Sequence, residues 1–469
     1  MSRLRELVQS YLKGSDSDVL VTDQWATFTR AEFYKKVFQY VDLFNQSWAS
    51  VPSSSKSVAI LLERNADYLA AIFATWISGG FYLPLHTNTP VSLNQKYIDL
   101  SGVSFLLTNE SFKNVSGKKN EVPCFKSEQN NLAYIIFTSG STGEKKGVAI
   151  SKSSLVAYAD AIKAQFSRKF TARSLIINGE LTFDISIADL IFALLFRAEI
   201  CITEESKNLL SLCALVQQRN VEAIYAVPST WEKIIELEKK LEDFSFSCVR
   251  NIFSGGEALS ISLVRQLKEL CPFATIFNMY GPTEFTVNAT YFEVTDELFS
   301  DTGLASIPLG YPLPSVKVNI VANPPDNTGE LYLSGPQMMI GYVNAKTPFV
   351  VKDGVSYYPT GDLCYKDKTG LIHYIGRIRD YDKVSGYRIN LLSIERQFEG
   401  VIDGTIKLRI SDGKIICLVR QNDNEAEHKI CEKINQFAVS FLEPYERPSK
   451  IYCVKEFPLN SSGKLDWRE

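Results

Sequence analysis

The sequence is poor in the residues that metal sites and disulfide-rich folds need. It has only three His among 469 residues, and its nine Cys are scattered, with no CxxC pair. A zinc site needs clustered Cys and His ligands, so we expect neither a structural nor a catalytic zinc ion. The cysteine spacing is also unlike a disulfide framework, which favours a reducing compartment.

A long apolar run and an excess of one charge are missing as well. The longest apolar run near the middle of the chain, residues 190–196, ends at Arg197 and is much shorter than a bilayer requires. Residues 1–14 have apolar side chains at helical spacing, which is typical of an amphipathic helix and not of a signal peptide. The 50 Lys and Arg nearly balance the 53 Asp and Glu, which argues against a broad nucleic-acid surface. We therefore expect a cytoplasmic protein without nucleic-acid or membrane partners.

What the chain does have is the pattern of an α/β protein. Short apolar runs such as 57–62 and 132–137 alternate with longer helical patterns, which predicts mostly parallel sheets covered by helices. From residue 306 to 375, closely spaced Gly and Pro predict an antiparallel, β-barrel-like region. A charged stretch at 376–382 separates this region from a last segment of mixed strand and helix. We predict a large N-terminal domain, 1–378, and a small α+β domain, 379–469.

The sharpest local signal is the sequence TSGSTGEKKGV at residues 138–148. Its three glycines allow a tight turn and a close backbone approach to an anion, while its hydroxyls and lysines add donors and charge. A loop of this kind after a strand is suited to holding phosphates. It is not a Walker A loop, because no Gly-Lys-Ser or Gly-Lys-Thr occurs in it. Taken alone, a polar surface loop would be an equally good interpretation.

Seven further motifs give this loop a context. They are GGFYLPL (79–85), SGGE (254–257), NMYGPTE (278–284), YPTGDL (358–363), GRIRD (376–380), LEPY (442–445) and NSSGK (460–464). In this order and spacing the set resembles the adenylate-forming superfamily, most closely the adenylation domains of nonribosomal peptide synthetases and the D-alanyl carrier protein ligases. The resemblance covers nearly the whole chain. It implies a large core that binds ATP and substrate and a small, mobile domain that carries a catalytic lysine.

The resemblance also implies ATP and Mg²⁺ as cofactors and assigns a nucleotide site. Two anions react in such enzymes, so their charge must be neutralised by a metal ion and by cationic side chains. We expect Glu284 to bind Mg²⁺ and Lys464 to bond both the carboxylate and the α-phosphate. The expected phosphate-binding residues are Thr138, Ser139, Gly140, Ser141, Thr142, Gly143 and Lys146. The expected adenine- and ribose-binding residues are Gly255, Gly256, Glu257, Asn278, Tyr280, Gly281, Thr283, Asp362 and Arg377.

The substrate class depends on Asp184, which follows Phe183. In the resembling enzymes this Asp binds the substrate's α-ammonium by a charge-assisted hydrogen bond. An N-cap for the apolar run that follows is the alternative, and both roles could coexist. A gapless match places the side-chain pocket at Ile185, Ala188, Tyr225, Ile252, Ser254, Met279, Val287 and Asn288. Because no other carboxylate or lysine besides Asp184 and Lys464 appears in this set, a charged substrate side chain would be buried unpaired, so we expect a small or medium neutral amino acid.

Departures from the family pattern concern the second half of the reaction. The hinge between the two domains falls on Arg379 and Asp380, where Asp or Lys is usual at the first position. Further departures are His86, Asp382, Ser385 and Asn390. None of these positions belongs to the expected phosphate or ribose site. They bear on the thioester-forming conformation and on the surface that meets a carrier.

The predicted function is ATP-dependent activation of an amino acid as aminoacyl-AMP, with release of pyrophosphate and transfer to the phosphopantetheine thiol of a carrier protein. The chain ends five residues after Lys464 without a carrier domain, so either the natural protein stands alone or this sequence is a piece of a longer one. The expected partner is a phosphopantetheinylated carrier protein, and the expected ligase is a monomer. One alternative is an acyl-CoA ligase for a small carboxylic acid, against which Asp184 argues. Another is a catalytically silent homologue that acts as a binding module, against which the presence of Asp362, Glu284 and Lys464 argues.

Overall fold

The computed structural model divides the chain into two compact units. It describes residues 3–52, 56–115, 131–138, 145–205, 208–241, 244–300, 306–323, 328–378, 382–384, 387–389, 391–398, 401–402, 404–421, 426–455 and 457. Unit 1 comprises Met1–Thr87, Tyr97–Phe137 and Lys146–Arg379, and unit 2 comprises Asn88–Lys96, Thr138–Lys145 and Asp380–Glu469. The long break between them lies one residue after the predicted boundary, and two short segments from the first third of the chain belong to unit 2.

The largest sheet of unit 1 has a parallel centre. In the described residues its strands follow the order β15 (Tyr311–Pro312), β14 (Thr290–Glu293), β13 (Thr275–Tyr280), β12 (Asn251–Gly255), β11 (Ala223–Ala226), β9 (Ser174–Ile177), β10 (Glu199–Ile202), β1 (Val19–Thr22) and β2 (Thr27–Thr29). Neighbours from β13 to β1 are parallel, and the strands at both edges are antiparallel. All residues of β9 and β11 are buried, as expected for parallel strands covered on both faces. The predicted α/β class is confirmed.

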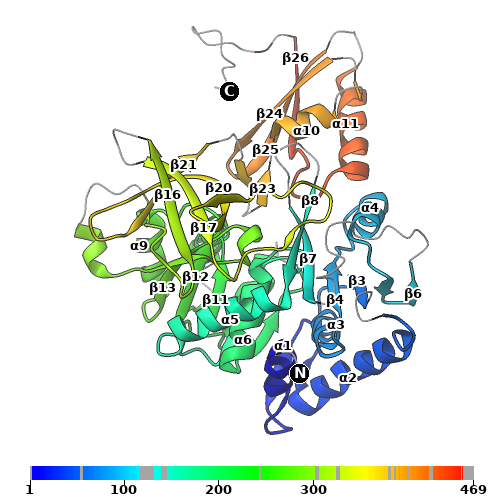
Figure 1. Cartoon of the computed structure of the whole chain (residues 1–469). Helices are drawn as coiled ribbons and strands as arrows, with labels where there is room; N and C mark the ends of the chain where they lie inside the picture. The colour runs from blue at the N-terminus through cyan, green and yellow to red at the C-terminus, as the bar shows by residue number, and fades with distance from the viewer. Residues whose placement is uncertain are drawn as a thin grey trace. The chain divides into compact units, whose positions relative to one another are not determined.

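The two faces of this sheet are covered by different helices. One face, with Tyr225 and Phe253, shares a hydrophobic core with α5 (Lys152–Phe166) and α6 (Ile185–Phe196). The rings of Phe166 and Phe192 lie against Phe253 on this side. The other face packs on α7 (Leu209–Arg219), α8 (Pro228–Leu241) and α9 (Ile261–Leu270). Figure 1 shows α5 and α6 side by side along the sheet. The apolar residues at the centre of the sheet therefore divide between two cores, one on each face.

A second sheet of unit 1 uses the strands before and after the Gly/Ser/Thr loop. Its order is β18 (Gly341–Tyr342), β8 (Lys146–Ser151), β7 (Leu132–Thr138), β4 (Phe81–Pro84), β3 (Ser57–Leu61), β5 (Phe105–Thr108) and β6 (Phe112–Asn114). The N-terminal helices α1 (Arg3–Leu12), α2 (Arg30–Ser47) and α3 (Ala66–Ile77) pack in the same hydrophobic core. Thr29 and Glu32 form a capping box at the start of α2, and Asn65 caps α3, so both helices begin where their sequences provide an acceptor. The helix α4 (Val91–Ser101) follows β4.

The Gly- and Pro-rich region forms an antiparallel sheet, as predicted. Its strands are β16 (Lys317–Asn323), β17 (Thr328–Ser334), β20 (Val355–Lys366), β19 (Val350–Lys352) and β21 (Ile372–Arg377). The long strand β20 pairs with β17, β19 and β21. Two short 3-10 helices, η3 (Thr283–Phe285) and η4 (Asp296–Ser300), precede this region. Pairing of Asp362 with Arg377 in the β20–β21 register brings two of the predicted site residues together.

Unit 2 has its own small core. It contains the hairpin β22 (Asp382–Val384) and β23 (Tyr387–Ile389), the helices α10 (Leu391–Gln397) and α11 (Glu427–Phe441), and the sheet of β24 (Gly404–Ser411), β25 (Lys414–Gln421) and β26 (Lys450–Val454). Ile394, Cys417 and Ile434 are buried at its centre. This is the α+β arrangement that the sequence predicts for the last segment.

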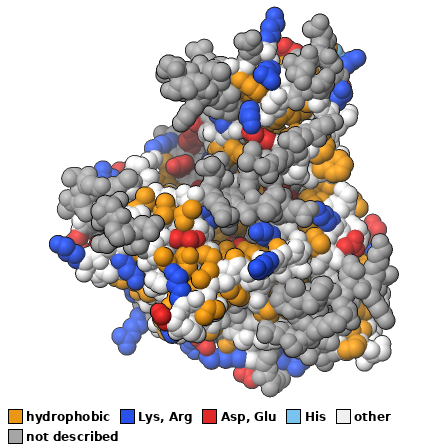
Figure 2. Space-filling model, turned by 45° about the horizontal axis from the view of Figure 1, so that its top comes forward, with side chains coloured by type: hydrophobic (Ala, Val, Ile, Leu, Met, Phe, Trp, Pro, Cys, Tyr) orange, Lys and Arg blue, Asp and Glu red, His pale blue; other side chains and the backbone are white. Residues whose placement is uncertain are grey.

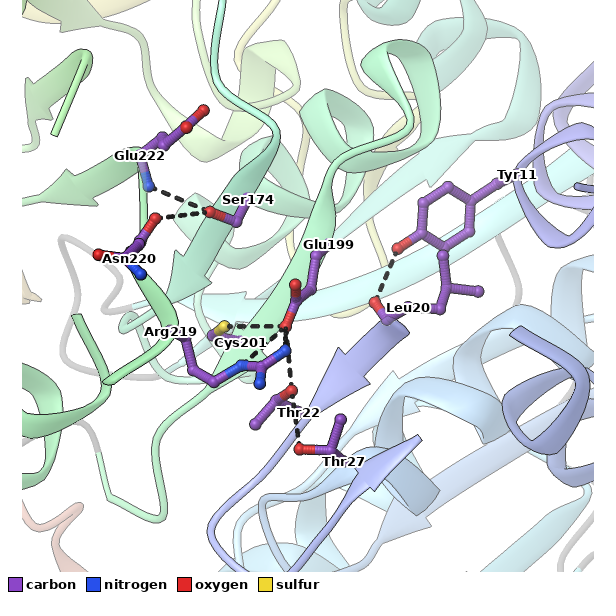
Figure 3. Close-up of polar contacts among 10 residues, drawn as sticks. All are labelled: Tyr11, Leu20, Thr22, Thr27, Ser174, Glu199, Cys201, Arg219, Asn220 and Glu222. Carbon is purple, nitrogen blue, oxygen red and sulfur yellow. Dashed lines mark hydrogen bonds and ion pairs between the residues drawn. The ribbon is translucent and has the colours of Figure 1, made fainter. Parts of the chain in front are cut away.

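Polar contacts fix the N-terminal strand to the edge of the large sheet (Figure 3). Glu199 on β10 accepts hydrogen bonds from Arg219 at 2.8 Å and from the Thr22 hydroxyl at 3.0 Å. The Tyr11 hydroxyl donates to the carbonyl of Ala198 at 2.9 Å. These contacts tie α1, β1 and α7 to one strand. We interpret the cluster as structural, because its charged groups satisfy one another.

The described surface carries both charge signs. Figure 2 shows Lys, Arg, Asp and Glu side chains interspersed over the visible face, with apolar side chains between them. This distribution agrees with the near balance of the composition. Within the described part of the chain, no helix has both the length and the apolar character that a membrane span requires.

Candidate active site

The carboxyl group of Asp184 is buried at the start of α6. The loop after β9 leads directly to this residue, whose side chain is about 5% exposed. Although Asp184 occupies the N-cap position, its side chain makes no capping hydrogen bond in the described helix. Burial raises the pKa of its carboxyl group to about 7; a hydrogen bond from Thr283 opposes this rise, and the nearby Glu284 adds to it. A buried carboxyl group that is not used as a cap is available to a cationic ligand.

Most of the predicted side-chain pocket lies on one face of the large sheet. Ile185 and Ala188 on α6, Tyr225 on β11 and Met279 on β13 belong to one hydrophobic core. Val287 is in the same core, and Asn288 follows it in the turn after η3. The charge of Asp184 acts on Tyr225, and both side chains are buried. Five of the eight predicted pocket residues thus share this core, and Asn288 joins them through its hydrogen bond to Tyr225.

Ile252 and Ser254 lie on the opposite face and do not join the pocket. Ile252 belongs to the core formed with α7, α8 and α9, as does Ala226, the partner of Ser254 across β11 and β12. Neighbouring residues of a strand point to opposite faces, so a one-residue slip in a match moves the side chain through the sheet. The residues that face Tyr225 on β12 are Phe253 and Gly255.

Gly255 leaves room for the Tyr225 hydroxyl. A Cβ atom at this position would lie 2.8 Å from the Tyr225 oxygen and 2.3 Å from the Met279 carbonyl oxygen. Only glycine fits there without displacing backbone. The alternation of side chains along β12 could have identified Phe253 and Gly255, whereas the motif match assigned Gly255 to the nucleotide.

A chain of hydrogen bonds fixes the tyrosine in this pocket. The Tyr158 hydroxyl on α5 donates to Asn288 Oδ1 at 2.8 Å, and Asn288 Nδ2 donates to the Tyr225 hydroxyl at 2.9 Å. All three residues are buried. No local motif marks Tyr158, which is 130 residues away from Asn288, so sequence reasoning missed it.

Asp189 is a second buried carboxyl group that sequence reasoning missed. It lies on α6, and its charge acts on both Tyr158 and Tyr225. Burial raises its pKa well above the ordinary range, an effect that the neighbouring Arg64 only partly offsets. Asp189 was not among the residues expected in the pocket, and its charge acts on two residues of the hydrogen-bonded chain there. Because the raised pKa favours the neutral form of Asp189, the pocket still offers little to balance a charged substrate side chain.

The turn that carries Asn288 has an unusual backbone. Thr286 and Val287 have φ angles of 55° and 71°, a region that β-branched residues rarely adopt. Side-chain hydrogen bonds hold the turn in place: the Thr286 hydroxyl donates to the Gln337 carbonyl at 2.5 Å, and Gln337 Nε2 donates to the Asn288 carbonyl at 2.8 Å. Gly281 packs against this turn so closely that a Cβ atom would lie 2.4 Å from the Val287 carbonyl oxygen.

Asp362, Tyr280 and Arg377, three of the residues expected to bind adenine and ribose, are in contact with one another. The Tyr280 hydroxyl donates to Asp362 Oδ2 at 2.6 Å, and Arg377 Nε lies 3.3 Å from Asp362 Oδ1. Arg377 also donates to the Thr360 carbonyl at 3.0 Å, which fixes the guanidinium. A buried carboxylate with acceptor oxygens is the chemistry that two ribose hydroxyls need.

The other expected adenine-site residues make contacts of their own. Asn278 Nδ2 donates to the Pro308 carbonyl at 2.8 Å, and the Glu257 carboxylate accepts from the Ser229 amide at 2.9 Å. Gly256 has a φ of 85°, which glycine adopts freely. Thr283 begins η3 and is buried.

Glu284, the expected Mg²⁺ ligand, lies in η3. Its Oε1 accepts a hydrogen bond from the Tyr342 hydroxyl at 2.7 Å, and Lys146 Nζ lies 5.2 Å from the centre of the Tyr342 ring. Its side chain is buried, and carboxylate oxygen is the ligand that Mg²⁺ prefers, so the residue fits the expected metal role. Among the described residues, no group of three or more His, Cys, Asp or Glu side chains could hold a metal ion. Mg²⁺ in nucleotide sites is commonly held by one or two carboxylates with substrate phosphates.

Several expected site residues lie outside the described residues: Ser139, Gly140, Ser141, Thr142, Gly143, Arg379, Asp380 and Lys464. Thr138 ends β7 and is half-buried. In unit 2, Lys145 Nζ lies 2.6 Å from Glu446 Oε1 and 2.8 Å from the Tyr445 hydroxyl. This lysine precedes Lys146 and ends the Gly/Ser/Thr loop.

Comparison with known proteins gives consistent relatives. The family model described as AMP-binding enzyme matches residues 9–343. Zwittermicin A synthase ZmaJ of Bacillus cereus is 27% identical over 502 residues, covering 99% of this chain and 93% of that protein. A D-alanine–D-alanyl carrier protein ligase of Listeria innocua is 29% identical over 477 residues, covering 92% of each chain. Subunits of longer synthases also match, and the chain spans 8% to 17% of their length.

A solved structure has the same fold. The crystal structure of the Vibrio cholerae adenylation domain AlmE in complex with glycyl-adenosine-5'-phosphate superimposes with a TM-score of 0.79. The match covers 99% of this chain and 96% of that chain at 22% identity. At this identity the likeness concerns the fold.

Proposed function

The chain belongs to the AMP-binding enzyme family of adenylate-forming enzymes, and from that premise we propose that it activates an amino acid and loads it onto a carrier protein. In the first half-reaction a carboxylate oxygen of the amino acid bonds to the α-phosphorus of ATP, and the bond to the β-phosphate breaks, so that pyrophosphate leaves. In the second, the phosphopantetheine sulfur bonds to the carbonyl carbon, AMP leaves, and the thiol proton passes to solvent.

The observation that supports an amino-acid substrate is the burial of Asp184. Its carboxyl group lies at the start of α6 without a capping bond, next to the residues of the proposed side-chain pocket. An α-ammonium bound there would form a charge-assisted hydrogen bond that a simple carboxylic acid cannot make. The similarity to a D-alanyl carrier protein ligase along 92% of each chain supports the same substrate class and a carrier partner.

The other site residues have roles in the same proposal. Asp362, oriented by Tyr280 and Arg377, would accept hydrogen bonds from the ribose hydroxyls. Glu284 would hold Mg²⁺, whose charge offsets that of the phosphates. Lys146 and the loop before it would contact the phosphates, and Lys464 would bond the developing charge between carboxylate and α-phosphate. Arg379 and Asp380 would be the hinge positions.

Amino-acid-dependent exchange of labelled pyrophosphate into ATP tests the first half-reaction. We expect exchange with one or a few neutral amino acids, and none when the amino acid is omitted. Loading of a phosphopantetheinylated carrier protein, compared with free CoA as acceptor, tests the second half. Preferred formation of a CoA thioester from a carboxylic acid that lacks an amino group would overturn the proposal. Lys464→Ala is the matched inactive variant, with a loss of several orders of magnitude expected in exchange.

A further inference from the structure

We infer that the Tyr225 hydroxyl, already held in position, donates a hydrogen bond to the substrate side chain. The enzyme then selects a short, uncharged amino acid whose side chain carries an oxygen acceptor on Cβ or on the next atom. Serine, threonine and asparagine are the chemical models for this class. The inference rests on the proposed function and concerns the side-chain end of the same site.

The directions of these hydrogen bonds leave the Tyr225 O–H group without an acceptor in this chain of contacts. Tyr158 donates to Asn288 Oδ1, and Asn288 Nδ2 in turn donates to the Tyr225 oxygen. Tyr225 therefore receives a hydrogen bond and keeps its own O–H proton. Among the described residues, no acceptor for this proton is found. Burial raises the pKa of Tyr225, so the hydroxyl stays protonated and remains a donor.

Packing fixes where this donor lies. The Tyr225 oxygen packs against Gly255, where a Cβ atom would lie only 2.8 Å from it, so the absence of a side chain at this position fixes where the hydroxyl lies. The Tyr225 ring packs against Phe253 on the same face, with centroids 6.0 Å apart. Asp184, the proposed ammonium site, acts on Tyr225 through its charge, so both groups belong to one buried region.

A buried donor without an acceptor has a cost that a suitable ligand removes. A site built to hydrogen-bond an oxygen rejects an analogue that lacks it, because the buried donor is then left unpaired. Tyr158 acts through Asn288 and not by contact with the substrate, so it is a positioning residue. Removing its hydroxyl should loosen Asn288 and weaken the selection without abolishing adenylate formation.

Pairs of amino acids with the same shape provide the test. Pyrophosphate exchange would be measured with threonine against valine, serine against 2-aminobutyrate, and asparagine against leucine. For the full-length wild-type chain we expect kcat/KM to favour the polar member of at least one pair by about 100-fold or more. In Tyr225→Phe this ratio should fall to about 10 or less, mainly through a higher KM for the polar member.

Two further variants separate a local role from general damage. Tyr158→Phe should lower the ratio by about three- to tenfold while leaving the KM of the apolar member unchanged. Tyr68→Phe is the matched control: its buried hydroxyl donates to backbone carbonyls of Ile60 and Leu85, and its loss should leave the ratio unchanged.

Distinct outcomes would contradict the inference and the function. A wild-type preference for the apolar members, for ornithine or for lysine, or a ratio that survives in Tyr225→Phe, would overturn the donor role alone. If no amino acid supports exchange while a carboxylic acid without an amino group does, the proposed function falls, and this inference with it.

Discussion

At the scale of single residues, Asp184 is an ionisable carboxyl group in a buried position, where a charge is unfavourable. It is buried, and it accepts hydrogen bonds from Thr283 and from the backbone at Asp184 and Ile185. Burial outweighs these hydrogen bonds and raises the pKa, since it disfavours the ionised form. Ionisation of this carboxyl group should therefore reduce the stability of the ligand-free protein as the pH rises from about 4, its unfolded pKa, to about 7. A bound ammonium would reverse this effect by stabilising the carboxylate.

This property predicts a pH dependence of substrate binding. Only the ionised form of Asp184 pairs with an ammonium group, so KM for the amino acid should fall as the pH is raised through about 7. Asp184→Asn should remove this dependence and raise KM for the amino acid by about 100-fold or more, because the buried ammonium loses its partner. Pyrophosphate exchange between about pH 6 and 8 provides the measurement. KM for ATP is the internal control and should change far less. An Asp184→Asn enzyme with an unchanged amino-acid KM and altered stability only would show that the residue serves the fold.

Which site residues could be predicted depends on how each is positioned. Tyr280, Glu284 and Asp362 lie in short motifs, and the structure places Tyr280 and Asp362 in direct contact. Tyr158 and Asp189 carry no motif and reach the pocket only because α5 and α6 pack on the same sheet face. Such contacts arise from tertiary packing, which residue spacing along the chain does not contain. Prediction from local motifs therefore misses residues that two different helices bring to the same pocket.

At the scale of elements, strand β12 shows how one residue of register decides a role. Ser254 is fully buried on the face opposite Tyr225, and its hydroxyl has no hydrogen-bond partner among the described residues. Ser254→Ala should leave KM for the amino acid unchanged and alter the free energy of unfolding by no more than about 1 kcal/mol. Gly255→Ala, one residue further, should impair exchange severely, because its Cβ would meet the Met279 carbonyl oxygen at 2.3 Å. Exchange kinetics and urea unfolding check both. A higher amino-acid KM in Ser254→Ala would mean that the pocket lies on the other face.

The turn at residues 286–288 is the second element whose geometry bears on the substrate. The Thr286 hydroxyl bond to Gln337 helps to hold a backbone that is unfavourable for β-branched residues. Thr286→Val keeps the side-chain shape and removes this bond, which should cost about 1–2 kcal/mol of unfolding free energy and raise KM for the amino acid several-fold, since the turn carries Asn288.

A matched control for this variant lies a few residues away. The buried Thr290 hydroxyl donates to the Leu309 carbonyl at 2.6 Å, outside the turn. Thr290→Val should cost a similar unfolding free energy and leave KM for the amino acid unchanged. Equal effects of both variants on KM would show that general stability, and not the turn, controls substrate binding.

At the scale of the whole molecule, the fold class follows from the sequence more directly than the assignment of segments to units. Alternating apolar runs predict the parallel sheets, because strands buried on both faces need apolar residues throughout. The placement of Asn88–Lys96 and Thr138–Lys145 with unit 2 has no such signal. It depends on contacts with residues hundreds of positions away, such as the hydrogen bond from the Thr89 hydroxyl to Glu443 at 2.8 Å.

The two units have separate hydrophobic cores, so a lesion in one core should act locally. In unit 2 the Lys145–Glu446 pair is almost completely buried, with side-chain exposures of 11% and 7%. Glu446→Gln removes the charge opposite Lys145 and should cost about 3 kcal/mol, because a buried cation then loses its carboxylate partner. Amide hydrogen exchange should accelerate in β24, β25 and α11 and stay unchanged in β12 and β13.

Lys407→Met is the control in the same unit. Its pair with Glu395 has a lysine that is 41% exposed, and such pairs contribute at most about 1 kcal/mol. Faster exchange throughout both units in Glu446→Gln would mean that they unfold as one cooperative body, in which case the division into two cores has no thermodynamic counterpart.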